Sequence, residues 1–181
     1  MPPKIITTYD KARLLLSDGD VVFFSHHSGV GDRIIKFWQW VTHKKSESNV
    51  GYSFSHVGMV LTLGTRLFLL ESSFAGGVRM VLLSSRQPDL IVKMKMTWNQ
   101  EAENFALENL GRKYGLIEAI RAGLGLRETM NDRFICTEYV TGICNKMGYY
   151  FPKVKQLPNN FFAQLESEAK TMIWINNASD I

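Results

Sequence analysis

The chain carries FSHVG at residues 54–58 and FICTEYV at residues 134–140, and these two stretches decide how the rest of the sequence is interpreted. His56 stands where a β-strand pattern begins, and Cys136 stands where a helical pattern begins. A thiol and an imidazole are the nucleophile and the base that acyl transfer to cysteine requires. The pair therefore predicts a thiol-dependent enzyme in which the histidine precedes the cysteine along the chain.

Length and composition fit one globular domain over residues 1–181. With 181 residues and 45% hydrophobic content, the chain is long enough to bury a core without disulfides or metals. The net charge is +4, but basic and acidic residues alternate along the sequence and no aromatic-rich basic stripe occurs. This pattern favours a solvated surface over a nucleic-acid site.

The first sixteen residues contain several charges among short apolar runs, so they do not form a secretory signal. We therefore expect a cytoplasmic protein, or a virion-associated one if the source is a virus. No stretch approaches the roughly 18 to 20 apolar residues of a membrane span, which leaves only peripheral membrane contact open. Cys136 and Cys144 fall in one predicted helix, separated by a rise of about 12 Å, which is too far for a disulfide.

The hydrophobic pattern predicts an α+β fold, with a mostly antiparallel sheet packed against helices. Strands are expected at 21–24, 55–63, 66–73, 78–83 and 90–96, with residues 172–175 as an edge strand. Helices are expected at 32–43, 99–110, 116–126, 134–147 and 161–169. The aromatic helix at 32–43 packs on the sheet, or else faces a substrate or a membrane, and its sequence leaves these alternatives open.

Gly64 and Thr65 form a two-residue loop between two strand patterns and so fix a hairpin register. If Leu63 pairs with Arg66, His56 and Glu71 become diagonal neighbours on one face, with backbones about 7 Å apart. We therefore expect the carboxylate of Glu71 to reach the imidazole of His56.

Cys136 falls in the first turn of the helix expected at 134–147, which Asn131 or Asp132 caps and Gly148 ends. Backbone N–H groups and the positive end of the helix dipole favour thiolate over thiol at such a position. The same N–H groups would stabilise the oxyanion of a tetrahedral intermediate. Cys144 lies two turns further along and is assigned to the core. Glu138 is expected to be a helix N-terminal carboxylate rather than a catalytic base.

The remaining histidines suggest no metal site. His26 and His27 lie in a Ser/Gly-rich loop and are expected at the surface or at the rim of a substrate site, while His43 ends the aromatic helix. No pair of these histidines has ligand spacing beside a pair of cysteines. We therefore predict no metal and no organic cofactor.

Five segments in succession resemble the motifs of the circularly permuted NlpC/P60 papain-like proteins, which include the YiiX/YebB-like group. These segments are GDVVFF (19–24), FSHVGMV (54–60), LESS (70–73) followed by Gly77 and Val78, GRKYG (111–115) and FICTEYV (134–140). The resemblance covers about residues 17–165. In that family the histidine strand precedes the cysteine helix, as it does here.

The resemblance implies a papain-like domain in which Cys136 is the nucleophile, His56 the base and Glu71 the group that orients the imidazole. Tyr114 matches a family tyrosine near the site. The sequence departs from the family at His26 and His27, which follow the first strand, and at Thr137, where a serine is common.

The resemblance leaves the substrate open. The first expectation is a cysteine peptidase or amidase that cleaves an amide in a peptide or a peptidoglycan stem peptide. Lecithin:retinol acyltransferase-like proteins share the permuted core, so a hydrolase or acyltransferase acting on a lipid or other acyl ester is the alternative. A non-catalytic binding or virion-associated module is the second alternative.

Overall fold

The computed structural model describes residues 2–25, 54–115, 133–151 and 157–176. The helices predicted at 32–43 and 116–126 lie outside these ranges. The described elements are β1 (Lys4–Thr7), α1 (Tyr9–Ala12), the 3₁₀ turn η1 (Arg13–Leu15), β2 (Val21–Phe24), β3 (His56–Leu63), β4 (Arg66–Ser73), β5 (Gly77–Leu82), the 3₁₀ turn η3 (Leu83–Ser85), β6 (Leu90–Met94), α3 (Gln100–Glu108), α5 (Cys136–Lys146), α6 (Pro158–Leu165) and β7 (Ala169–Ile175).

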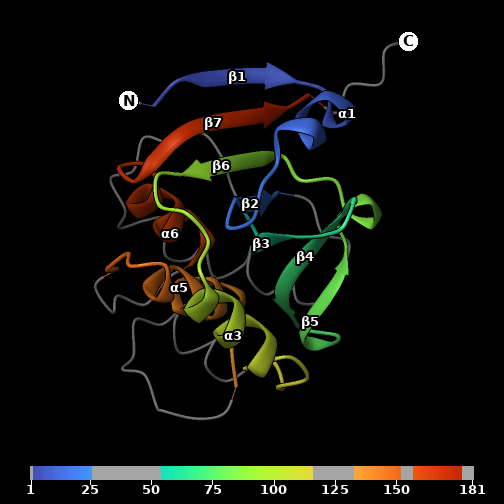
Figure 1. Ribbon diagram of the computed structural model, residues 1–181, viewed down its shortest axis with the longest axis vertical. Helices are drawn as coiled ribbons and strands as arrows, with labels where there is room; N and C mark the ends of the chain where they lie inside the picture. The colour runs from blue at the N-terminus through green and yellow to red at the C-terminus, as the bar shows by residue number, and fades with distance from the viewer. Residues whose placement is uncertain (1, 26–53, 116–132, 152–156, 177–181) are drawn as a thin grey trace.

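Within the described part of the chain the strands form one seven-stranded sheet in the order β1-β7-β6-β2-β3-β4-β5. Neighbouring strands pair antiparallel, except β1 and β7, which pair parallel. Figure 1 shows β1, β7 and β6 at one end of the sheet, β4 and β5 at the other, and α3, α5 and α6 grouped on one side. The structure confirms a mixed α+β fold with a mostly antiparallel sheet.

Both faces of the central strands are covered. On β2, Val21 and Phe23 belong to the larger core, whereas Val22 and Phe24 belong to a smaller core on the other face. The larger core also contains residues of α3, α5 and α6, namely Ala102, Ala106, Tyr139, Val140, Ile143, Phe161 and Leu165. Burying each of the large apolar side chains contributes roughly 2 kcal/mol. Burial on both faces explains why β2 is a continuous apolar run.

The predicted hairpin between β3 and β4 is confirmed. Leu63 pairs with Arg66, and the ladder continues to the pair of Met59 with Leu70. Gly64 has a φ of +61°, as the first central residue of a type II′ hairpin loop requires. Beyond Met59, the start of β3 pairs with β2 on its other side.

The prediction of an edge strand at 172–175 is wrong. These residues belong to β7, which is longer and lies between β1 and β6, so β1 forms that edge of the sheet. β1 escaped prediction because three of its four residues are exposed, so it has no alternating apolar pattern. The N–H of Met172 also donates to the carbonyl of Pro3 at 2.9 Å, which extends the contact between the two strands.

Two predicted helices have different ends. The helix expected at 134–147 begins at Cys136, with Ile135 as its N-cap in place of Asn131 or Asp132. The helix expected at 161–169 is α6, which begins at Pro158 and ends at Leu165. Proline suits a first helical position because its missing N–H has no partner there to lose. No helix in the described ranges is long and apolar enough to cross a membrane.

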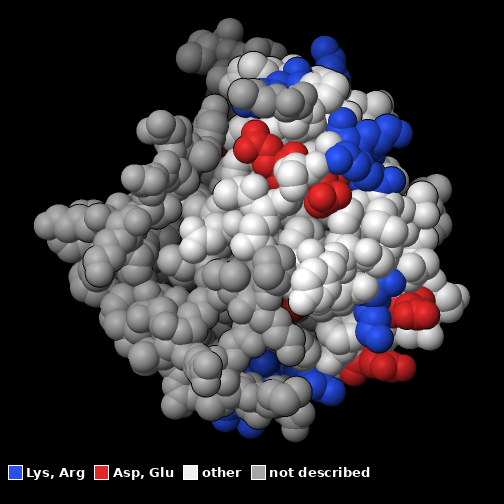
Figure 2. All heavy atoms as spheres, turned by 90° about the vertical axis from the view of Figure 1, so that its left-hand side faces the viewer, with Lys and Arg blue, Asp and Glu red and all other residues white. Residues whose placement is uncertain are grey.

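Charged side chains are mixed on the face shown in Figure 2. The described Lys and Arg side chains form separate small groups there, with Asp and Glu side chains beside some of them. One ion pair joins β6 to the residue before β2: Nζ of Lys93 lies 2.7 Å from Oδ2 of the buried Asp20. The described part of this face therefore carries no single continuous basic stripe.

Candidate active site

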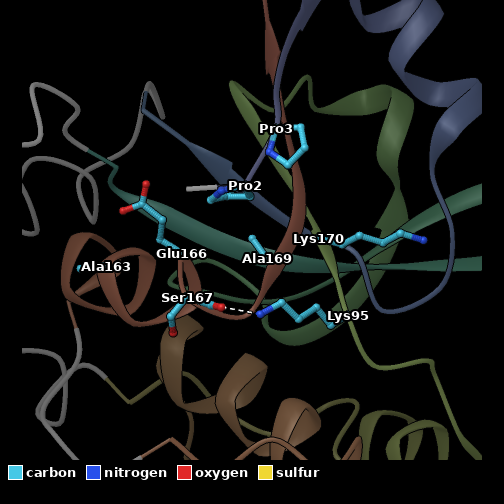
Figure 3. Close-up of a pocket in the computed structure, with 8 residues that line it drawn as sticks. All are labelled: Pro2, Pro3, Lys95, Ala163, Glu166, Ser167, Ala169 and Lys170. Carbon is cyan, nitrogen blue, oxygen red and sulfur yellow. Dashed lines mark hydrogen bonds between the residues drawn. The ribbon is translucent and has the colours of Figure 1, made fainter.

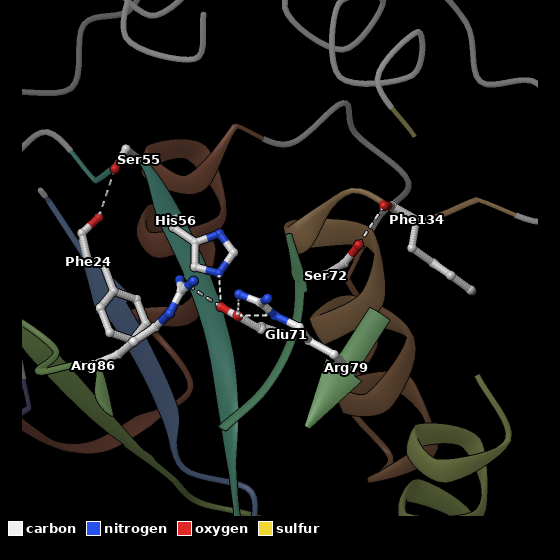
Figure 4. Close-up of polar contacts among 8 residues, drawn as sticks. All are labelled: Phe24, Ser55, His56, Glu71, Ser72, Arg79, Arg86 and Phe134. Atoms are coloured by element: carbon white, nitrogen blue, oxygen red, sulfur yellow. Dashed lines mark hydrogen bonds and ion pairs between the residues drawn. The ribbon is translucent and has the colours of Figure 1, made fainter. Parts of the chain in front are cut away.

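His56 and Glu71 meet as the hairpin register predicts. Nε2 of His56, at the start of β3, lies 2.7 Å from Oε2 of Glu71 on β4. The His56 residue is 7% exposed and Glu71 is 0% exposed. Figure 4 shows the imidazole pointing toward the carboxylate. The contact uses Nε2, so Nδ1 is the ring nitrogen left for another partner.

The residues before β3 and its first residue, His56, are fixed by neighbours on two sides. The N–H of Ser55 donates to the carbonyl of Phe24 at 2.9 Å, and the N–H of Phe54 donates to Oδ1 of Asn159 at 2.8 Å. The rings of Phe24 and His56 also pack with their centroids 5.8 Å apart. These contacts restrict both the backbone and the imidazole of His56.

Glu71 also accepts from two arginines. Arg79 on β5 donates through Nε to Oε1 at 2.8 Å, and its Nη2 lies 2.7 Å from the same oxygen. Nη1 of Arg86, which follows η3, lies 3.2 Å from Oε2. Burial alone would raise the pKa of Glu71, but His56, Arg86 and Arg79 outweigh it and lower that pKa to about 2. Glu71 is therefore an anion throughout the physiological pH range.

His56 interacts with Cys136 as well as with Glu71. Burial alone would lower the pKa of His56, but hydrogen bonds with Cys136 and Glu71 and the negative charges of both groups raise it to about 9. The structure thus brings the three predicted catalytic side chains together, because His56 interacts with both Cys136 and Glu71.

Cys136 is the first residue of α5. The hydrogen-bond ladder of that helix starts with the N–H of Tyr139, which donates to the carbonyl of Ile135 at 3.1 Å. Oε2 of Glu138 accepts from the N–H of Ile135 at 3.0 Å. This contact confirms that Glu138 is a helix N-terminal carboxylate. The N-cap residue is Ile135, which makes no side-chain cap hydrogen bond, so the cap predicted at Asn131 or Asp132 is wrong.

The segment before α5 is joined to the sheet by Ser72. Its hydroxyl donates to the carbonyl of Phe134 at 2.7 Å, as Figure 4 shows. Phe134 also forms an isolated parallel bridge with Tyr114. Because Ser72 is adjacent to Glu71 in β4, the same strand positions the carboxylate and the start of the cysteine helix.

Tyr114 lies close enough to Cys136 for the charge of Cys136 to affect the ionisation of the Tyr114 phenol. Burial raises the pKa of the Tyr114 phenol, and the negative charges of Cys136 and Glu138 raise it further. The ring packs edge-on against Phe74 with centroids 5.9 Å apart, and Phe74 is 46% exposed. The position of Tyr114 agrees with its predicted place beside the site. His26 and His27 lie outside the described residues.

Cys144 is a core residue, as predicted. It is fully buried in the larger core, and burial raises the pKa of its thiol. Both cysteines are free. Among the described residues, the two thiols of α5 thus have different surroundings, because Cys136 interacts with His56 and Cys144 is packed in the core.

Arg79 and Arg86 were missed in the sequence, although one of them had a signal. The Gly76-Gly77 turn sets a second hairpin in which Ser73 pairs with Gly77 and Glu71 pairs with Arg79. Extending the register across that turn would have placed an arginine directly opposite the predicted carboxylate. Arg86 follows a 3₁₀ turn, and no sequence periodicity relates it to Glu71.

A groove of about 690 Å³ lies elsewhere in the molecule and contains none of the predicted site residues. Its lining includes Pro2, Pro3, Lys95, Ser167 and Lys170, as Figure 3 shows. Nζ of Lys95 donates to the carbonyl of Ser167 at 2.6 Å across one wall. The predicted catalytic residues and this groove are therefore separate features of the structure.

The chain matches no protein-family model and no curated protein. Among solved structures it is similar to the metalloprotein YiiX of Escherichia coli O157:H7, described as DUF1105, with a TM-score of 0.54. The sequences are 18% identical, and the match covers 90% of each chain. The chain has the YiiX fold. YiiX belongs to the YiiX/YebB-like group that the motifs resemble, so the coarse form of that resemblance is confirmed at the level of the fold.

Proposed function

We propose that this protein is a thiol-dependent hydrolase with a permuted NlpC/P60 papain-like site. In this proposal Cys136 is the nucleophile, His56 is the general base and acid, and Glu71 orients the imidazole. The observation that carries it is the buried His56, which is hydrogen-bonded to Glu71 at 2.7 Å and to Cys136 at the first position of α5. A nucleophile, a base and an orienting group in contact are the arrangement that covalent acyl transfer requires.

The proposed reaction has two halves that share one proton carrier. The thiol proton of Cys136 passes to His56 before the attack, the thiolate sulfur bonds to the substrate carbonyl carbon, and the C–N bond breaks as His56 gives that proton to the leaving amine. Water then attacks the thioester and gives one proton to His56, which passes it to the departing sulfur. The products are a carboxylic acid and an amine. With a pKa of about 9, His56 holds a proton at neutral pH and is suited to protonating the amine.

The oxyanion of each tetrahedral intermediate would lie at the N-terminal end of α5. Backbone N–H groups and the helix dipole stabilise negative charge at such a position. The start of α5 is itself held by Glu138 and by the contact of Ser72 with Phe134. A fixed helix start supports the proposal, because donors that need no rearrangement contribute most to this step.

The substrate that we propose first is an amide in a peptide or a peptidoglycan stem peptide. The alternative is a lipid or other acyl ester, cleaved or transferred by the same three residues. A non-catalytic binding or virion-associated module is the third proposal, and the contacts among Cys136, His56 and Glu71 weigh against it because a binding role needs none of them.

YiiX is described as a metalloprotein, and a metal in this chain would need its own set of donor side chains. A catalytic zinc takes three protein ligands. Among the described residues, no group of three or more His, Cys, Asp or Glu side chains is arranged so that it could hold a metal ion. The carboxylate of Glu71 already contacts Nε2 of His56 and two arginines, and Nε2 of His56 already contacts Glu71. The described residues do not fit a metal, and the proposed mechanism involves none.

A substrate panel tests the proposal. Peptide amides, a peptidoglycan stem peptide and acyl esters are incubated with the protein, and mass spectrometry follows products and any acyl group on Cys136. We expect an acyl adduct on Cys136 and turnover that Cys136→Ser abolishes, while Cys144→Ser retains it. Activity that survives Cys136→Ser would contradict the assignment of Cys136 as the nucleophile. A preference for amide or for ester substrates would decide between the two enzymatic alternatives.

A further inference from the structure

The carboxylate of Glu71 is fully buried and contacts three cationic or ionisable side chains. Each of its oxygens has a defined set of partners. Oε1 is held by Nε and Nη2 of Arg79, and Oε2 is shared by Nε2 of His56 and Nη1 of Arg86. Figure 4 shows both guanidinium groups converging on this carboxylate from different elements.

We propose that Arg79 and Arg86 are positioning residues of the hydrolase site. They keep Glu71 ionised and turned toward His56, so Nε2 of the imidazole carries a hydrogen and Nδ1 is the nitrogen that exchanges the proton of Cys136. This inference rests on the proposed function, and it adds two residues that act through Glu71 without touching the substrate.

The hydrogen-bonding capacity of a carboxylate depends on its charge. An ionised carboxylate only accepts hydrogen bonds, so the Nε2 atom beside it has to donate. A neutral carboxyl group would have a hydrogen of its own to donate, and the tautomer of His56 would then be undefined. Burial favours the neutral form of an isolated glutamate. Cationic partners are therefore needed to keep Glu71 an obligatory acceptor.

The two arginines have different parts in this arrangement. Arg79 pairs directly across from Glu71 in the β4–β5 ladder and places two donors on Oε1, which turns Oε2 toward His56. Arg86 contacts Oε2, the oxygen that also receives the imidazole. Orientation thus depends mainly on Arg79, while both arginines supply charge.

The turn before β5 leaves room for the Arg79 side chain. A Cβ atom at Gly76 would lie 2.9 Å from Nη1 and 3.0 Å from Cδ of Arg79. The side chains of Arg79 and Arg86 are only 31% and 24% exposed. Their contacts with Glu71 are therefore partly shielded from solvent. Salt screens such partly buried ion pairs less than it screens pairs on an open surface.

The test measures the ring of His56 directly. Protein labelled with ¹⁵N-histidine is compared as wild type, Arg79→Gln, Arg79→Lys and Arg86→Gln, with the exposed Arg66→Gln as the matched control. NMR reports the Nε2–H signal of His56, and iodoacetamide reports the reactivity of Cys136. Dispersed spectra and an unchanged urea midpoint for the control confirm that a change is local.

In wild type and Arg66→Gln we expect a defined Nε2–H signal, protected from exchange by its carboxylate partner. Arg79→Gln should lose that signal and slow Cys136 alkylation about tenfold. This factor is smaller than the full contribution of a positioned base, because Arg79 acts on that base indirectly. Arg79→Lys should restore part of both, because it keeps the charge without the planar pair of donors. If Arg79→Gln does not fold, Arg79→Lys and Arg86→Gln carry the same comparison.

A double variant shows whether Arg79 acts through Glu71. Adding Arg79→Gln to Glu71→Gln should cause no further loss of alkylation rate, because residues of one network are not additive. A protected Nε2–H signal and wild-type alkylation in both Arg79→Gln and Arg86→Gln would overturn the positioning role. That outcome leaves the proposed hydrolase intact. A wild-type Cys136 that is no more reactive than Cys144 would instead contradict the hydrolase, while the NMR comparison would still decide the role of the arginines.

Discussion

Nε2 of His56 and Oε2 of Glu71 are 2.7 Å apart although the two residues are separated by fifteen positions in the chain. The Gly64-Thr65 loop between β3 and β4 makes this contact, because it fixes which residues of the two strands face each other. The pair is buried, so the imidazole and the carboxylate depend on each other and on the arginines around them. Each partner can therefore be tested through the other.

Glu71→Gln should slow Cys136 alkylation roughly 10- to 100-fold at pH 7, because the variant keeps the size of the side chain but removes the charge that orients His56. It should also lower the free energy of unfolding, since Arg79 and Arg86 lose a buried anion. Alkylation kinetics and urea unfolding check the two effects. Glu108→Gln, on the exposed side of α3, is the control. Equal rates for the two variants would remove Glu71 from the site.

The free energy of unfolding should decrease at both alkaline and acidic pH, which gives its pH dependence an alkaline limb and an acid limb. The pKa of His56 is raised from 6.5 to about 9, so its stabilisation is complete below pH 6.5 and disappears as the pH rises through 9. The pKa of Glu71 is lowered from 4.5 to about 2, so its stabilisation is complete above pH 4.5 and disappears as the pH falls through 2. Each limb amounts to roughly 3 kcal/mol.

Urea unfolding between pH 2 and pH 10 measures these limbs. The alkaline limb depends on Cys136 and Glu71, whose negative charges face His56, and on the opposing charges of Arg79 and Arg86. His56→Gln should therefore flatten the curve between pH 6.5 and 9, whereas part of the loss at low pH should remain because Arg79 and Arg86 still lower the pKa of Glu71. An alkaline limb of unchanged size in that variant would show that another group is responsible.

The hairpin and the core strands were predictable because their signals are local. β2 is a continuous apolar run after a Gly-Asp turn, and Gly64 fixes the β3–β4 register without help from other elements. The contact of His56 with Glu71 follows from that register alone. The position of Cys136 at the start of a helix also follows from an element boundary, although α5 starts at Cys136 and not at Phe134.

The remaining features depend on contacts between distant segments. β1 is short and mostly exposed and becomes a strand because β7 provides a parallel partner. Arg86 reaches Glu71 from a 3₁₀ turn, a position set by tertiary packing. The N-cap residue of α5 is Ile135, so no Ser, Thr, Asn or Asp at that position marked the start of the helix, and Glu138 contacts the N–H of Ile135 from within the helix.

Gly142→Ala should destabilise the protein although alanine normally favours a helix. A Cβ atom at Gly142 would lie 2.5 Å from Cζ of Phe105, so α5 and α3 have to separate or the ring has to move. Overpacking of this kind costs about 1–3 kcal/mol. Urea unfolding measures the loss, and the exposed Lys146→Ala in the same helix should change stability by less than about 0.5 kcal/mol. A gain in stability for Gly142→Ala would mean that the two helices are less tightly packed than described.

The most direct test of the proposed site compares the two cysteines of α5. Cys144→Ser leaves Cys136 as the only thiol, and Cys136→Ser leaves Cys144. Each protein is treated with iodoacetamide between pH 6 and pH 9, with and without His56→Ala, and labelling in urea gives the rate of the exposed thiol. Thiolate is the reactive form, so the rate reports activation as well as access.

We predict that Cys136 reacts at pH 7 at least about tenfold faster than Cys144, and that His56→Ala removes most of this difference, in proportion to the contribution of a positioned base. Loss of the difference in His56→Ala separates activation from burial, since both thiols are buried in the wild type. If Cys136 reacts no faster than Cys144, or reacts equally fast with and without His56, the thiol-hydrolase account is contradicted.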